Sequence, residues 1–187
     1  MLRRAYRSVT NCSRRRCAVT AGFSDPGARE RTYTWVDPQV YLDAAQGRSG
    51  LELFQHLLET DTPPPPIGQT LGFRLVEVGK GLAVFAIEPA EHLYNPIGSV
   101  HGGVYATLLD SAAGCAVHTT LPVGVGYTSL DLAVKFLRGM SPDGGEVRAI
   151  GTVVHAGRRT ALAEAKMVDS KGRLLATATS SCLILNP

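Results

Sequence analysis

The pattern of apolar and polar positions changes its period along the chain. Between residues 48 and 60, four apolar side chains recur at helical spacing: Leu51, Phe54, Leu57 and Leu58. Ser49 and Glu52 have the spacing of a capping box, so we expect a short amphipathic helix. The four prolines at 63–66 cannot continue that helix, and they predict an extended arm.

Strand-like alternation dominates after the prolines. Segments 70–78 and 82–89 are joined by Gly79-Lys80-Gly81, which favours an antiparallel hairpin. Four more strand-like segments end the chain, at residues 127–137, 145–156, 160–170 and 173–185. Their short connections favour antiparallel neighbours over βαβ crossovers.

The segment from Gly102 to about Leu121 differs from these strands. Apolar and small residues surround it, which predicts a helix buried nearly all round. The element order is therefore two strands, one long helix and four strands. One antiparallel sheet curled around a single helix gives this order a common core, so we predict an α+β fold.

Charge is concentrated at the N-terminus. The first 24 residues hold six of the 19 basic residues and no acid, which leaves 13 basic against 16 acidic residues in the rest of the chain. A nucleic-acid-binding surface would concentrate basic residues on the folded body, so we expect no nucleic-acid partner. No run of 18 apolar residues predicts a membrane span.

These features predict three regions: a basic, disordered extension over 1–47, an accessory helix over 48–62 and the main domain over 63–187. The acid-free, Arg- and Ser/Thr-rich start has the character of an organelle transit peptide. We prefer a plain basic extension on a cytoplasmic protein. The four cysteines show no metal-ligand spacing with the histidines, so we expect no metal.

Candidate chemistry gathers in NPIGSVHGGVYATLLDSAAG, residues 95–114. A helix N-terminus exposes unpaired N–H groups, so the Gly102 N–H is a candidate donor to an oxyanion, and Gly103 lets another group approach the backbone. The Asn95 amide could polarise a carbonyl or orient water. His101 could cap the turn, and we do not expect it to be the base.

Asp110 is the only acid of this helix and the preferred base or nucleophile. The structural alternative is a carboxylate that bonds to Ser111 or the backbone, or points to solvent. Asp110 lies eight residues beyond Gly102, about 12 Å along one helix at about 1.5 Å per residue. One carboxylate cannot attack a carbonyl held at its own helix's N-terminus, so we expect Asp110 to face Gly102 and Asn95 of a second subunit across a two-fold axis.

The pattern N-P-x-G-x-x-H-G-G, followed seven positions later by Asp110, resembles the hot-dog fold acyl-CoA thioesterase superfamily, and most closely its phenylacetate-pathway (PaaI-like) branch. The resemblance covers residues 63–185. It implies a sheet wrapped around one helix, hydrolysis of an aromatic or medium-chain acyl-CoA, and no cofactor beyond the CoA of the substrate. It also implies paired sites in a homodimer, a homotetramer, and Ser129 as a small hydroxyl near the base.

Several assignments are less specific. Arg138, Arg158 and Arg159 are candidate contacts for CoA phosphates, although each could equally lie in a solvated turn. Strand alternation places Asp131 on the face of Ser129 as a possible second acid. A flat strand face of small residues could stack two dimers: Ala161, Ala163 and Ala165. The alternative function is a non-catalytic acyl-CoA-binding module.

Overall fold

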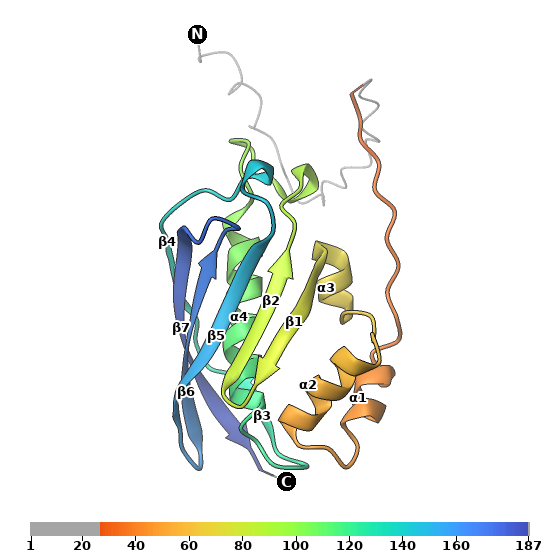
Figure 1. Ribbon diagram of the computed structural model, residues 1–187, viewed down its shortest axis with the longest axis vertical. Coiled ribbons are helices and arrows are strands. Elements are labelled where there is room, and N and C mark those ends of the chain that lie inside the picture. Colours follow the sequence, from red (N-terminus) through yellow and green to blue (C-terminus); the bar gives the residue numbers. More distant parts are fainter. Residues whose placement is uncertain (1–26, 187) are drawn as a thin grey trace, which may run out of the picture. The chain divides into compact units, whose positions relative to one another are not determined.

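One antiparallel sheet of seven strands dominates the computed structural model, which describes residues 27–186 (Figure 1). The strands are β1 (Phe73–Gly79), β2 (Leu82–Ile87), β3 (Gly126–Ser129), β4 (Ala133–Phe136), β5 (Val147–Ala156), β6 (Thr160–Val168) and β7 (Leu174–Leu185). Their order is β1-β2-β5-β6-β7-β3, and β4 also pairs with β7. The predicted α+β fold with antiparallel neighbours is confirmed.

The chain divides into two compact units, Met1–Thr32 and Tyr33–Pro187. All the described helices and strands belong to the second unit. The basic segment 1–24, with its possible transit-peptide character, lies outside the described residues. Within the described part of the chain, no helix combines the length and the hydropathy that crossing a membrane requires.

The long helix α4 (Gly102–His118) packs against the inner face of the sheet and passes behind it in Figure 1. Small residues make this contact close: Ala112, Ala113 and Ala116 are fully buried. A Cβ built at Gly151 of β5 would lie 2.1 Å from the Ala112 carbonyl oxygen. Glycine at this position therefore lets the helix approach the sheet backbone directly.

Three further helices precede the sheet: α1 (Gln39–Ala45), α2 (Gly50–Glu59) and α3 (Pro66–Leu71). The capping box predicted for α2 is present, with reciprocal bonds between Ser49 and Glu52. Two helices differ from the expectations. Part of the predicted extension forms α1, and Pro66 begins α3 because proline is tolerated at the first position of a helix.

The segment predicted as one strand over 127–137 forms two strands, β3 and β4. Ser129 pairs with Cys182 and Ala133 with Thr179, so this edge contains one more residue than β7 over the same length. That extra residue is a bulge, and it resets the alternation of side chains. The expectation that Asp131 continues the alternation of Ser129 is therefore wrong: its Oδ1 accepts a bond from the Ser181 N–H at 3.0 Å.

The alanines of β6 also differ from their predicted role. Ala161, Ala163 and Ala165 are buried in the core that packs around α4. The side chains on the other face of β6 include Leu162, Glu164 and Lys166, all of which are exposed. The alanines are small because the sheet lies close to the helix, so they cannot provide a stacking surface between dimers.

Candidate active site

The N-terminus of α4 is held by His101, the N-cap residue. The His101 Nδ1 accepts a hydrogen bond from the Gly103 N–H at 2.9 Å, and the His101 N–H donates to the Leu93 carbonyl at 2.8 Å. The Gly103 N–H is thus already engaged. Within the described residues the Gly102 N–H has no recorded partner, which leaves it as the donor at this end of the helix.

Gly102 is also close to an aromatic ring of β4. A Cβ built at Gly102 would lie 3.2 Å from the Cζ atom of Phe136. The Phe136 ring in turn meets Tyr105 edge to face, and the Tyr105 hydroxyl donates to the Arg138 carbonyl at 3.1 Å. The glycine therefore leaves the helix N-terminus beside the aromatic ring of Phe136, which is itself largely exposed.

Asn95 closes the loop that leads into α4. Its Oδ1 accepts bonds from the N–H groups of Ile97 and Ser99 at 3.1 and 3.2 Å, and its Nδ2 donates to the Ser99 Oγ at 3.2 Å. Gly98 completes the turn with φ +82, a conformation that favours glycine. An amide carries two donor hydrogens, so one donor of Asn95 is left for a ligand.

Asp110 lies midway along α4 and is half-buried. Its Oδ1 accepts a hydrogen bond from the Ser129 hydroxyl of β3 at 2.9 Å. This is the single hydrogen bond recorded for the carboxylate among the described residues, so the Oδ2 atom is left for water or substrate. Ser111 is engaged elsewhere, since its hydroxyl donates to the Thr107 carbonyl at 2.8 Å.

The carboxylate lies close enough to neighbouring groups to influence their ionisation. Burial raises the pKa of the Cys115 thiol to about 12; a bond with Tyr127 opposes this rise and the Asp110 charge adds to it. Burial likewise raises the pKa of Tyr127, with a smaller contribution from Asp110. Cys115 is therefore a neutral thiol, which excludes it as a nucleophile at neutral pH.

The three candidate arginines do not meet in one chain. Arg138 donates to the Leu174 carbonyl at 2.7 Å, at the start of β7. Arg158 and Arg159 occupy the turn between β5 and β6, and the Arg159 carbonyl accepts from the Ile184 N–H near the end of β7. Ten residues of extended strand, about 33 Å, separate these ends. Arg138 and the Arg158–Arg159 turn of one chain therefore cannot bind the same phosphate of a CoA.

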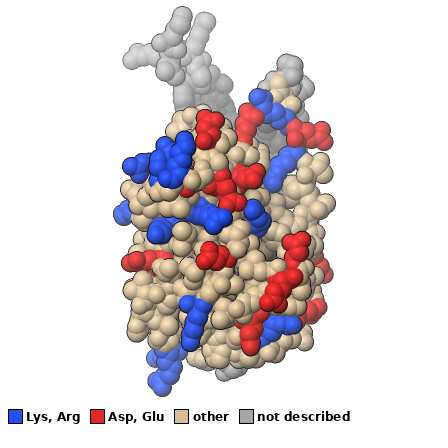
Figure 2. Space-filling view, in the orientation of Figure 1, with Lys and Arg blue, Asp and Glu red and all other residues tan. Residues whose placement is uncertain are grey.

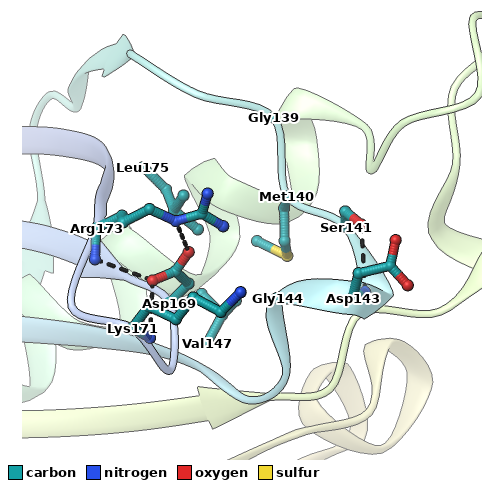
Figure 3. Close-up of a pocket in the computed structure, with 10 residues that line it drawn as sticks. All are labelled: Gly139, Met140, Ser141, Asp143, Gly144, Val147, Asp169, Lys171, Arg173 and Leu175. Atoms are coloured by element: carbon teal, nitrogen blue, oxygen red, sulfur yellow. Dashed lines mark hydrogen bonds and ion pairs between the residues drawn. The ribbon is translucent and has the colours of Figure 1, made fainter.

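A polar pocket of about 230 Å³ lies beside the β6–β7 turn (Figure 3). Its buried acid, Asp169, accepts from the N–H groups of Lys171 and Arg173 and from the Arg173 Nε at 2.7 Å. Burial acts to raise the pKa of Asp169, but these hydrogen bonds outweigh it and hold the pKa below its usual value. With its acceptors engaged in closing the turn, Asp169 is not a candidate base.

Within residues 27–186, neither charge on the face shown nor clustered metal ligands mark another site. On the face shown in Figure 2, acidic and basic side chains are interspersed rather than gathered by sign. Across residues 27–186, no group of three or more His, Cys, Asp or Glu side chains is arranged to hold a metal ion.

Sequence reasoning did not identify two aromatic residues of the site. Tyr127 packs against His118 with ring centroids 5.4 Å apart, and its hydroxyl would lie 2.7 Å from a Cβ at Gly114. Phe136 lies beside Gly102. The spacing of Tyr127 and Ser129 was the available signal, since residues two apart share one face of a strand. Phe136 could not be identified without the register in which β4 pairs with β7.

Comparisons with known proteins identify relatives of this chain. Residues 97–176 match the family model described as the thioesterase superfamily. The chain is 31% identical over 107 residues to the 1,4-dihydroxy-2-naphthoyl-CoA hydrolase of Listeria monocytogenes, across 57% of this chain and 85% of that protein. It is 26% identical over 115 residues to the proofreading thioesterase EntH of Cronobacter sakazakii, across 62% and 82% of the two chains.

Solved structures show the same fold. A phenylacetic acid degradation-related protein from Ralstonia eutropha aligns with a TM-score of 0.62 at 28% identity, over 70% of this chain and 98% of that one. The PaaI protein of the E. coli phenylacetic acid degradation operon aligns with a TM-score of 0.62 at 20% identity, over 71% and 93%.

Proposed function

Because this chain belongs to the thioesterase superfamily, we propose that it hydrolyses an acyl-CoA thioester to a free acid and CoA, with Asp110 as the base or nucleophile. The observation that carries this proposal is the hydrogen bond from Ser129 to Asp110 at 2.9 Å, which orients one oxygen and leaves the other for reaction. A carboxylate held in this way can activate water or attack a carbonyl.

Both chemical routes balance with these residues. In the first, Asp110 takes a proton from water as the hydroxide oxygen bonds to the thioester carbonyl carbon, and the C–S bond then breaks as Asp110 returns that proton to the leaving sulfur of CoA. In the second, the Asp110 oxygen displaces CoA and forms an anhydride, which water hydrolyses. In each route the carbonyl oxygen gains negative charge, and a helix N–H group can stabilise that charge.

The donor to that oxygen would come from a second subunit. Gly102 and Asp110 belong to the same helix and are about 12 Å apart along its axis. Two copies of α4 running antiparallel across a two-fold axis would bring Asp110 of one copy to Gly102 and Asn95 of the other. The edge position of β3, which carries the exposed Ser129, supports this pairing.

The remaining roles follow from the same dimer. Arg138 and the Arg158–Arg159 turn lie at opposite ends of β7, so antiparallel copies would bring the two groups toward one another for CoA phosphates. Gly103 would let the pantetheine arm pass close to the helix. The route above uses no cofactor beyond the substrate's own CoA. We further expect a tetramer of two dimers and a cytoplasmic location.

Thiol release from butanoyl-, dodecanoyl- and 4-hydroxybenzoyl-CoA tests the proposal directly. We expect the wild-type chain to hydrolyse at least one of them and Asp110→Asn to lower kcat by about a thousandfold, the order expected for loss of a general base. The substitution keeps size and fold, so unfolding by heat should be nearly unchanged. Wild-type turnover in Asp110→Asn would exclude the mechanism. Binding without turnover by the wild type would favour an acyl-CoA-binding module.

A further inference from the structure

An apolar cavity of about 520 Å³ lies between the N-terminal helices and the edge of the sheet. Its outer wall comes from α1, α2 and the proline run, and includes Leu53, Phe54 and Leu57. Its inner wall comes from β1 and β2, and includes Phe73 and Phe85. Apart from Cys115, both walls precede residues 97–176, so they are built by a part of the chain that the family model does not match.

Cys115 is the one α4 residue that lines this cavity, and it lies near enough to Asp110 for the carboxylate charge to act on its thiol. It lies five residues beyond Asp110 on the same helix, an axial distance of about 7.5 Å. Thr107, Ser111 and Cys115 are spaced by four residues and are all half-buried, so they form a partly open stripe along α4 beside Asp110. The stripe starts in the helical turn that carries Asp110 and ends at the cavity, with Cys115 about 140° around the helix axis from Asp110.

Two polar side chains around the cavity are bonded within the chain, and Asp61 and Thr62 also line it. The Tyr41 hydroxyl donates to the Pro63 carbonyl at 2.7 Å, and Arg74 pairs with Glu146 at 3.1 Å. Among the described residues, no buried side-chain nitrogen or oxygen is without a partner. A hydroxylated aromatic ring placed against the apolar walls, away from Asp61 and Thr62, would leave its hydroxyl groups unpaired, which is unfavourable. A plain hydrocarbon chain has no such groups.

The volume fits a chain of medium to long length. Small-molecule sites commonly enclose about 300–1,000 Å³, and a cavity of about 150 Å³ is enough for benzene. The volume of about 520 Å³ is several times that of the benzene cavity. It therefore accommodates a hydrocarbon on the order of ten to sixteen carbons, allowing for the part that extends toward solvent.

We infer that this cavity, closed by α1, α2 and the proline run, binds the unbranched hydrocarbon chain of an acyl-CoA whose carbonyl lies at Asp110 of the same subunit. This inference rests on the proposed function for the position of the carbonyl, and it names the acyl class. Cys115 serves as a neutral wall of the passage, and the N-terminal helices set the length of chain that is accepted.

The first test is the dependence of kcat/KM on chain length. We expect dodecanoyl-CoA to exceed butanoyl-CoA by at least about 30-fold, because each buried methylene favours binding by up to about fourfold. We expect 4-hydroxybenzoyl-CoA to be a poorer substrate than dodecanoyl-CoA. A flat series, or a preference for the hydroxylated ring, would overturn the inference.

The second test fills the cavity. Leu57 is half-buried on α2 and lines the cavity, whereas Gln55 is exposed on the same helix and does not. Leu57→Trp should lower kcat/KM for dodecanoyl-CoA by at least about tenfold and leave butanoyl-CoA within about twofold. Gln55→Trp should leave both values unchanged. Leu57→Ala should instead shift the optimum toward longer chains, and equal effects on both substrates would contradict the inference.

Binding separates this inference from the proposed function. Calorimetry with Asp110→Asn should show tighter binding of dodecanoyl-CoA than of butanoyl-CoA, and adding Leu57→Trp should abolish the difference. If no acyl-CoA is hydrolysed but this difference is found, the cavity assignment stands and the hydrolase fails. If butanoyl-CoA is hydrolysed but the difference is missing, the hydrolase stands and the cavity assignment fails.

Discussion

Asp110 and Asp169 are two shielded carboxylates in one small protein, and their surroundings differ. Asp169 is 5% exposed and accepts bonds from two backbone N–H groups and the Arg173 guanidinium. Asp110 is half-buried in the middle of a helix and accepts one bond, from the Ser129 hydroxyl. The bonds that Asp169 accepts all come from its own turn, whereas Asp110 keeps one carboxylate oxygen available to another molecule.

A structural acid and a reactive acid differ in how many hydrogen bonds their carboxylates accept. A carboxylate whose acceptors are occupied and whose charge is paired is a poor base, because its lone pairs and charge already stabilise the fold. A carboxylate oriented by one neutral hydroxyl keeps an oxygen free. For the same reason Asp169 stabilises the β6–β7 turn, whereas Asp110, which lies beside the partly open stripe of α4, is the candidate catalytic acid.

The largest effect should come from mixing two inactive chains. If Asp110 acts with Asn95 of the other subunit, then Asp110→Asn and Asn95→Ala impair opposite halves of each site. A hybrid dimer then contains one intact site and one doubly impaired site. Random exchange should restore up to about one quarter of wild-type thiol release, from a residual level near one thousandth.

This experiment requires proof that subunits exchange, which native mass spectrometry of differently tagged chains provides. Mixing Asp110→Asn with itself is the matched control and should stay inactive. Hybrids that form without recovering activity would show that each site is built within one subunit. That result would also require Asp110 to act with a donor other than the Gly102 N–H.

Asp169→Asn should show the opposite phenotype, with lower stability and retained catalysis. The amide cannot accept all the bonds that close the β6–β7 turn, and it loses the ion pair with Arg173. The pKa of Asp169 lies below its usual value, so its stabilisation is complete above the unfolded carboxyl pKa of about 3.9 and is lost as the pH falls through the folded value.

The measurement is the Tm of wild type and Asp169→Asn from pH 7 down to pH 3. The variant should have the lower Tm at pH 7, and the difference should shrink below about pH 4 as the wild-type carboxylate is protonated. Thiol release at pH 7 and moderate temperature should stay near the wild-type value. A variant with wild-type Tm but lost turnover would reverse the roles assigned to the two acids.

The fold was predictable because its signals are local. The Gly79-Lys80-Gly81 turn, the capping box of Ser49 and Glu52, and the run of small residues after Gly102 each specify one element through short-range chemistry. Antiparallel order followed from the short connections. The break after Ser129 was not predictable, because a bulge depends on the register of β3 and β4 against β7.

The candidate site was predictable in its residue types and less so in its contacts. The sequence placed His101 at the start of this helix, Asp110 along it and Asn95 in the loop before it. The sequence could not show that most of the Asn95 side chain is used within its own loop, or that the alanines of β6 face the helix. The apolar cavity was not foreseen either, since it joins α1 and α2 to a distant strand pair.

Ser129→Ala should have the smallest effect and tests the orientation of Asp110 most directly. Removing the hydroxyl leaves the carboxylate present but no longer held, so we expect kcat/KM to fall about tenfold, as for loss of one positioning hydrogen bond. Ser129 is exposed, so the free energy of unfolding should change by less than about 0.5 kcal/mol. Thr128→Ala, also exposed on β3, is the matched control and should retain wild-type kcat/KM. Ser129→Thr keeps the donor and should recover most of the activity, whereas equal losses in Ser129→Thr and Ser129→Ala would assign the effect to packing at the strand edge rather than to the hydrogen bond.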